Sequence, residues 1–212
     1  MLDAFIHKAK RFGITDLPGL NAQLELASLS FDASKIRPNK DSKKAGVLAV
    51  ILMNQKASPR LLYIKRSTQE NDKHSGQISF PGGQFEAKDK TLLDCALRET
   101  KEEVGIDSLH LQILGALTQM YVHVSDFIIQ PYLAICESVP TYILEEKEVA
   151  TIIEYPISEL LEKQAVKYKD MTLRNHLLKQ VPYFDLHGEI LWGATAMITN
   201  EILHLIRSPH KL

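Results

Sequence analysis

Three glutamates, Glu99, Glu102 and Glu103, lie close together in a segment of helix-forming residues. At about 100° of rotation per residue, Glu102 falls near 300° and Glu103 near 40° from Glu99, so the three carboxylates share one face of a helix. The apolar residues of the segment form a separate stripe, which is expected to pack on a core. Asp89 is a candidate N-cap of this helix, and Gly105 is a candidate C-terminal stop.

A glycine-rich turn, Phe80–Gly83, precedes the acidic helix at short range. A charged helix face is usually a solvated surface. Here, however, the like charges of Glu99 and Glu103 at i and i+4 destabilise the helix by a few tenths of a kcal/mol. Glycines let the backbone approach a ligand or offer a carbonyl to a metal ion, and Mg²⁺ typically takes one or two carboxylates plus substrate phosphates. The turn and the helix therefore predict two walls of a Mg²⁺–phosphate site.

The elements that must position these residues follow from the apolar patterning. The residues before and after this site form strand-length apolar runs, and two of the runs, joined by the turn 54–59, read as a hairpin. Apolar residues at helical spacing predict a short helix near the N-terminus, and Pro156 is expected at the first position of another helix. The pattern indicates a mixed sheet between helices. The expected strands are 46–53, 60–66, 111–119, 127–136 and 148–155, and the expected helices include 2–12 and 193–207.

Composition excludes several classes of protein. With 212 residues, 45% of them hydrophobic, the chain has enough apolar residues for a folded core. A net charge of −1 argues against a broad nucleic-acid surface. Two cysteines cannot form a disulfide framework, and neither a signal peptide nor a membrane-length apolar run is present. We therefore expect a cytoplasmic protein that binds no nucleic acid and no membrane.

The segment 98–106, RETKEEVGI, together with Gly83, resembles the Nudix box. Its second half agrees at every fixed position. Asp89 stands where glutamate is usual, and the spacer from Asp89 to Arg98 is one residue longer than in the commonest form. No P-loop, dinucleotide-binding, HExxH or CxxC signature competes with this resemblance.

The longer spacer is similar to that of the coenzyme A pyrophosphatase branch of the family. Residues 61–62, 66–67 and 76–83 resemble the pattern that precedes the box in that branch, and 148–149 and 190–195 resemble later parts of it. The resemblance covers roughly residues 44 to 207. It implies an α/β protein, a Nudix-type α/β/α sandwich with a mixed β-sheet and with N-terminal and C-terminal helices. Residues 1–43 are then a helical extension and linker, and residues 44–212 are the hydrolase domain.

The same resemblance implies a pyrophosphohydrolase that requires Mg²⁺ or Mn²⁺ and splits coenzyme A or acyl-coenzyme A. Glu99 and Glu103 are the expected metal ligands, with the Gly83 carbonyl as a third. Glu102 is expected to bind the metal or to pair with Arg98, and Arg98 to serve mainly in that ion pair. The sequence does not predict the oligomeric state.

Residues outside the box complete the expected site. Glu148 is either a metal ligand or general base, as the resemblance implies, or one member of a solvated charge run. Arg66, Lys73 and His74 are the expected phosphate-binding residues, although Arg66 also fits ordinary surface charge and His74 a turn hydrogen bond. Asp72 replaces an arginine that is usual in this branch, so Lys73 would have to supply the charge without a bidentate geometry.

Two alternative functions remain open from the sequence. One is a Nudix pyrophosphatase for another nucleoside diphosphate derivative, such as ADP-ribose, which the segment 76–83 disfavours. The other is a non-catalytic module that senses a nucleotide. A module of that kind would be expected to lack box carboxylates, whereas Glu99, Glu102 and Glu103 are all present.

Overall fold

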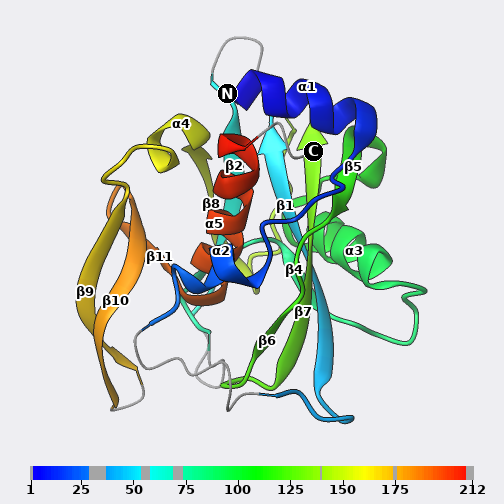
Figure 1. Cartoon of the computed structure of the whole chain (residues 1–212). Helices are drawn as coiled ribbons and strands as arrows, with labels where there is room; N and C mark the ends of the chain where they lie inside the picture. Colours follow the sequence, from blue (N-terminus) through cyan, green and yellow to red (C-terminus); the bar gives the residue numbers. More distant parts are fainter. Residues whose placement is uncertain are drawn as a thin grey trace.

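A mixed sheet lies between helices in the computed structural model of the chain, which describes residues 2–28, 37–53, 58–68, 74–138, 140–173 and 176–208. Helix α3 covers one face of the sheet, and α5 covers the other together with α1 and α2 (Figure 1). The predicted α/β/α sandwich is therefore confirmed. The helices are α1 (Leu2–Phe12), α2 (Leu20–Leu24), α3 (Leu92–Val104), α4 (Ile157–Leu160) and α5 (Gly193–Arg207), with a 3-10 turn at Ser108–His110.

Strand β1 (Lys43–Leu52) is the centre of the sheet. It runs parallel to β7 (Phe127–Cys136) and antiparallel to β2 (Arg60–Arg66) and β4 (Gly82–Gln84). The strand order is β3-β2-β1-β7-β5, with β4 also on β1, β6 on β7 and β8 on β2. The remaining strands of this sheet are β3 (Ile78–Ser79), β5 (Leu111–Ala116), β6 (Met120–Val122) and β8 (Val149–Pro156).

The alternation of side chains along β1 explains why its sequence is apolar without interruption. Leu48 and Val50 point toward α3, whereas Ala49 and Ile51 point toward α5. All four are fully buried, because helices cover both faces of the strand. The two faces thus form two separate hydrophobic cores.

The predicted strand at 60–66 and the predicted helix at 193–207 are confirmed residue for residue, and the predicted short N-terminal helix is confirmed as α1. Strand β5 ends at Ala116, three residues before its predicted end, and residues 54–57 of the predicted hairpin turn lie outside the described residues. The prediction for Pro156 was wrong by one residue. Pro156 has an extended ψ of 125° and ends β8, so α4 begins only at Ile157. No helix in the described ranges has the length and apolarity needed to cross a bilayer.

A second, three-stranded antiparallel sheet was not predicted. It consists of β9 (Val166–Leu173), β10 (His176–Leu186) and β11 (Glu189–Trp192). In Figure 1 its strands β9 and β10 lie at the left, whereas α3 lies at the right. Phe184, Leu186 and Leu191 join the core on the α5 side of the main sheet. Lys65 of β2 pairs with Glu189 of β11 at 2.5 Å, which ties the small sheet to the large one.

Polar contacts join helix α2 to helix α5. Glu201 of α5 is fully buried and accepts hydrogen bonds from Nε2 of Gln23 at 2.8 Å and from the hydroxyl of Thr118 at 2.5 Å. The side chain of Asn200 donates to the carbonyl of Ala22 at 2.7 Å. The segment 2–28 is therefore packed and hydrogen-bonded to α5. The division of the chain at residue 43 stays a prediction.

Candidate active site

Helix α3 is closed at both ends by its own sequence. The Thr91 hydroxyl accepts from the backbone N–H of Asp94, and the Asp94 carboxylate accepts from the backbone N–H of Thr91, so the two form a capping box. Gly105, at φ 77°, ends the helix in the left-handed conformation, as predicted. The prediction of Asp89 as the N-cap was wrong, because Thr91 has that position.

Asp89 instead anchors Arg98. Its two carboxylate oxygens accept from Nε and Nη2 of Arg98 at 2.8 and 2.9 Å. The guanidinium holds the pKa of the Asp89 carboxyl well below its usual range. The Nη1 group of Arg98 also donates to Glu99 at 2.7 Å and to Glu102 at 2.9 Å. Arg98 therefore orients two box carboxylates while Asp89 fixes the guanidinium itself.

Glu103 is the most deeply buried of the three glutamates, with 1% of the residue exposed. Its Oε2 accepts a hydrogen bond from the backbone N–H of Gly82 at 2.8 Å. Burial raises the pKa of Glu103 to about 8; Glu99 and Glu148 act in the same direction, whereas Arg66 lowers it. A buried carboxylate of this kind is stabilised in its ionised form by a nearby cation.

Glu99 stands directly against the backbone of Gly83. A Cβ atom placed on Gly83 would lie 2.5 Å from the Cδ and Oε1 atoms of Glu99, so only glycine leaves room for this carboxylate. Burial raises the pKa of Glu99, although Arg98 opposes that shift. The Gly83 carbonyl accepts from the thiol of Cys95, whose Sγ lies 3.4 Å away. Burial raises the pKa of this thiol to about 11, so Cys95 is a neutral neighbour of the turn.

The turn reaches the helix because β4 pairs with β1. Gly46 is opposite Gly83 in that pairing, and a Cβ atom at Gly46 would lie 2.2 Å from the carbonyl oxygen of Leu92 in α3. The absence of a side chain at position 46 allows α3 to lie directly on the strand. Helix and turn are thereby held directly against each other, and the Mg²⁺–phosphate site predicted between them stays a prediction.

Glu148 lies in the exposed turn just before β8, where Val149 is paired with Arg66 of β2. Its negative charge raises the pKa of both Glu99 and Glu103, while the positive charge of Arg66 lowers that of Glu103. Strands β2 and β8 therefore bring Arg66 and Glu148 into electrostatic range of the helix carboxylates.

The segment that carries Glu148 is also hydrogen-bonded to the end of α3, which the sequence did not indicate. The backbone N–H groups of Ile143 and Glu145 donate to the carbonyls of Val104 and Glu103, both at 3.2 Å. A Cβ atom at Gly105 would lie 2.8 Å from the nitrogen of Ile143, so the glycine permits this approach. The last turn of the helix and the segment before β8 thus form one unit.

The remaining predicted residues lie at the edge of this arrangement. The side chain of Glu102 is 52% exposed, and its Oε1 is 3.5 Å from Nζ of Lys88. His74 makes a local turn contact, with its Nδ1 atom 3.1 Å from Oε1 of Gln77. Lys73 lies outside the described residues.

The donor set fits a hard divalent cation. In the described ranges no three His, Cys, Asp or Glu side chains group closely enough to hold a metal ion by themselves. Glu99 nevertheless lies beside the backbone of Gly83, and Glu103 accepts from the backbone N–H of Gly82. Burial raises the pKa of both carboxyl groups. Mg²⁺ commonly takes only one or two carboxylates and completes its shell with water and phosphate oxygens. Mn²⁺ suits the same oxygen ligands.

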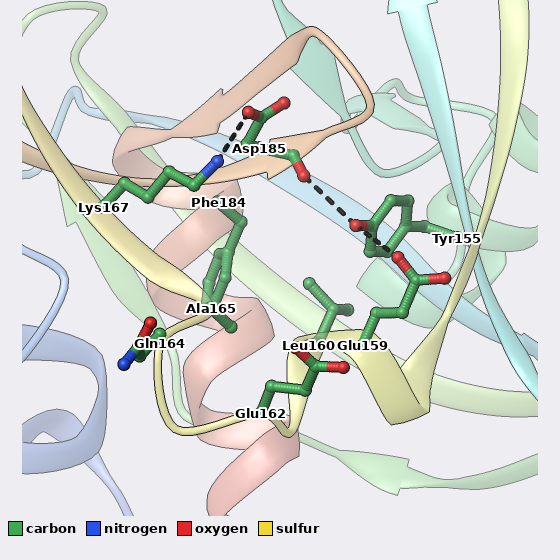
Figure 2. A pocket seen from close by; sticks show the side chains of 9 residues that line it. All are labelled: Tyr155, Glu159, Leu160, Glu162, Gln164, Ala165, Lys167, Phe184 and Asp185. Atoms are coloured by element: carbon green, nitrogen blue, oxygen red, sulfur yellow. Dashed lines mark hydrogen bonds and ion pairs between the residues drawn. The ribbon is translucent and has the colours of Figure 1, made fainter.

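A separate cavity lies between β8, α4, β9 and β10 and contains none of these residues (Figure 2). The hydroxyl of Tyr155 donates to Glu159 at 2.9 Å, and it lies 3.2 Å from the Asp185 carbonyl oxygen. Glu162 adds another carboxylate to the wall, and Lys167 is already paired with Asp185 at 2.8 Å. This acidic wall does not suit a phosphate, so the cavity is distinct from the candidate active site.

The chain is similar to several known proteins. A profile of the NUDIX domain matches residues 42–175, more than half of the chain. The chain is 31% identical over 191 residues to the protein named mitochondrial coenzyme A diphosphatase NUDT8 of Mus musculus, covering 89% of this chain and 90% of that protein. It is 30% identical over 171 residues to the uncharacterized Nudix hydrolase NudL of Photorhabdus laumondii, covering 81% of this chain and 89% of that protein.

Among solved structures, a MutT/nudix family protein from Enterococcus faecalis aligns with a TM-score of 0.51 at 14% identity, over 88% of this chain and 73% of that one. At this identity the likeness concerns the fold alone. The profile match and the relatives at 30% identity or above show the family as well as the fold. This chain belongs to the Nudix family and is a Nudix hydrolase.

Proposed function

We propose that this chain hydrolyses the pyrophosphate bond of coenzyme A or its derivatives with a bound Mg²⁺ or Mn²⁺. The products are adenosine 3′,5′-bisphosphate and 4′-phosphopantetheine. The observation that carries the proposal is that the buried Glu103 and the partly buried Glu99 contact the backbone of Gly82 and Gly83, respectively.

Glu99, Glu103 and the Gly83 carbonyl would hold the cation. When bound, the ion neutralises charge on the phosphate oxygens and lowers the pKa of a bound water. Glu102 adds a carboxylate at the rim. Arg98, fixed by Asp89, keeps Glu99 and Glu102 from turning away from the site.

Glu148 serves as the general base in this proposal. A water oxygen forms a bond to one phosphorus atom, and the bond from that phosphorus to the bridging oxygen breaks. The proton of the water passes to the Glu148 carboxylate, and the second phosphate leaves as an anion. Arg66, which lies beside Glu148 at the end of β2, pairs with the phosphate charge. His74 and Lys73 are further phosphate-binding residues in this proposal.

The names of the relatives support coenzyme A as the substrate, because two of them, from mouse and human, are called coenzyme A diphosphatases. The segment 76–83, which resembles that branch of the family, supports the same choice. The 3′-phosphate distinguishes coenzyme A from ADP-ribose. A charge-assisted contact with that phosphate contributes about 1.5–3 kcal/mol, which corresponds to roughly 10- to 150-fold in kcat/KM.

A panel of pyrophosphate substrates, with products identified by mass spectrometry, tests the proposal. Coenzyme A should be cleaved better than its 3′-dephospho form and better than ADP-ribose, and EDTA should abolish each reaction. Lys73→Ala should narrow the gap between coenzyme A and the dephospho form. Equal cleavage of those two by the unmutated protein would show that the 3′-phosphate is not recognised. Preference for ADP-ribose would overturn the substrate, and no cleavage of any member would favour a sensing module.

A further inference from the structure

The glycine-rich turn Phe80–Gly83 is anchored on both faces of the sheet. On the α3 side, the Gly82 N–H bonds Glu103. On the opposite side, Phe80 is 2% exposed and stacks on Tyr63 of β2, with the ring centroids 4.9 Å apart and the planes 27° from parallel. Between these contacts, the N–H of Leu48 donates to the Pro81 carbonyl at 2.9 Å. The position of the turn therefore depends on the ring of Tyr63 as well as on α3.

Tyr63 is in turn held by α5. Its hydroxyl oxygen lies 3.1 Å from the hydroxyl of Thr199, and both residues are fully buried. In the described part of the chain, neither hydroxyl has another hydrogen-bond partner. A continuous series of contacts thus leads from Thr199 through Tyr63 and Phe80 to the turn.

Packing alone does not require this pair of hydroxyls. Phenylalanine at position 63 and valine at position 199 would fill nearly the same space, and replacing both partners of a buried hydrogen bond with apolar groups is often nearly neutral. What the apolar pair lacks is direction, because a hydrogen bond weakens steeply when its angle changes. The hydroxyls therefore restrict how the Tyr63 ring sits against α5.

We propose that the Tyr63–Thr199 hydrogen bond fixes the plane of the Tyr63 ring and, through the Phe80 stack, the backbone of Gly82 and Gly83. Tyr63 and Thr199 are then positioning residues for the Nudix reaction. This inference rests on the proposed function for its kinetic consequences. The position of the turn itself can be measured without any substrate or metal.

The test compares Tyr63→Phe, Thr199→Val and the double variant with Tyr155→Phe as a matched control. Tyr155→Phe deletes a tyrosine hydroxyl of the same sheet, but its partners Glu159 and Asp185 line the cavity in Figure 2, and that lining includes no residue of the turn. The first readout is the amide NMR shift and hydrogen-exchange rate of Gly82 and Gly83 in the metal-free protein. The second is kcat and the dissociation constant of Mn²⁺, measured where every variant is fully folded.

Tyr63→Phe and Thr199→Val should each shift both glycine amides and speed exchange of the Gly82 amide, whereas Tyr155→Phe should not. Because a displacement of about 1 Å can lower a rate by about 100-fold, a fraction of that displacement should lower kcat by roughly 10-fold. The double variant should be no worse than either single one, since both remove the same bond. Weaker Mn²⁺ binding should accompany the loss.

Unchanged glycine amides in Tyr63→Phe and Thr199→Val, with only a lower free energy of unfolding, would reduce the pair to core packing and overturn the proposal. Glycine shifts as large in Tyr155→Phe would also overturn it, because the effect would not be specific to the turn. If the unmutated chain fails to cleave coenzyme A, the proposed substrate is wrong. The amide readout still decides the positioning role in that case.

Discussion

Gly83→Ala should strongly lower the activity of the enzyme while leaving its fold intact. Gly83 is not in the left-handed region, so its backbone accepts alanine. The new Cβ would lie 2.5 Å from the Oε1 and Cδ atoms of Glu99, whereas ordinary contacts begin at 3.4 Å. The carboxylate must therefore retreat by about 1 Å, which can lower a rate by about 100-fold. The Gly83 carbonyl is retained, so the loss would come from the displacement of Glu99.

Stability should change little, because the clashing atoms are at the far end of a flexible side chain. An off-rotamer Glu99 costs about 0.5–1.5 kcal/mol. Gly46→Ala is the contrast, since its Cβ would lie 2.2 Å from a backbone oxygen of α3 and 3.0 Å from the Ala96 nitrogen. Backbone atoms cannot turn aside, so we expect that variant to lose about 3 kcal/mol or more.

The assay pairs urea denaturation with kcat at saturating Mn²⁺. The free energy of unfolding of Gly83→Ala should lie within about 2 kcal/mol of that of the unmutated chain, and its kcat should be lower. Gly46→Ala should unfold at a much lower urea concentration. A Gly83→Ala enzyme with normal kcat would refute the assignment of Glu99 to the metal. Destabilisation equal to that of Gly46→Ala would refute the argument that a side chain absorbs the clash.

Three further outcomes follow from the site. Glu148→Gln should lower kcat by roughly 10²–10⁴-fold, as expected for a general base, and equally small effects for it and Glu145→Gln would return Glu148 to the solvated charge run. Because the pKa of Glu103 is raised to about 8, Mn²⁺ binding should release close to one proton at pH 7 and almost none at pH 9.5. Calorimetry of Mn²⁺ binding in buffers of different ionisation enthalpy measures this release, and equal binding heats in all buffers at pH 7 would contradict the prediction. Arg98 lowers the pKa of Asp89 below its ordinary 3.8, so this ion pair stabilises the fold above about pH 4 and stabilises it less as the pH falls. Asp89→Asn should therefore lower the free energy of unfolding at pH 7 by about 3 kcal/mol. The variant should also lose less stability than the unmutated chain as the pH is lowered, which denaturation at each pH would measure.

The elements that could be predicted from the sequence are those whose apolar residues decide their structure locally. Strand β7 and helix α5 have the bounds predicted from the apolar runs 127–136 and 193–207. Strands β9 and β10 could not be found in this way. Their charged residues, such as Lys167 and Lys169, are partly or largely exposed, so the segment contains no continuous apolar run. Strands β3 and β4 are two and three residues long and exist only through pairing with β2 and β1.

For the site, the sequence could predict what helical periodicity decides but not what long-range contacts decide. Helical spacing placed Glu99 and Glu103 on one face, but the burial of Glu103 and its bond to Gly82 depend on long-range pairing of β4 with β1. Asp89 precedes α3, so helical periodicity could not reveal its bidentate contact with Arg98. The roles of the nine predicted site residues stay predictions until they are measured.

The buried carboxylate of Glu201 has a consequence for how the protein is made. Gln23 leaves the ribosome well before α5, which follows every other element of the described chain. Until α5 emerges, Gln23 and Thr118 lack the Glu201 carboxylate as an acceptor, and the face of the sheet beneath α5 stays exposed to water. Folding that depends on such distant contacts is slow and leaves an aggregation-prone intermediate. The nascent chain therefore completes its fold only after synthesis of α5, and this interval is when a chaperone would be needed.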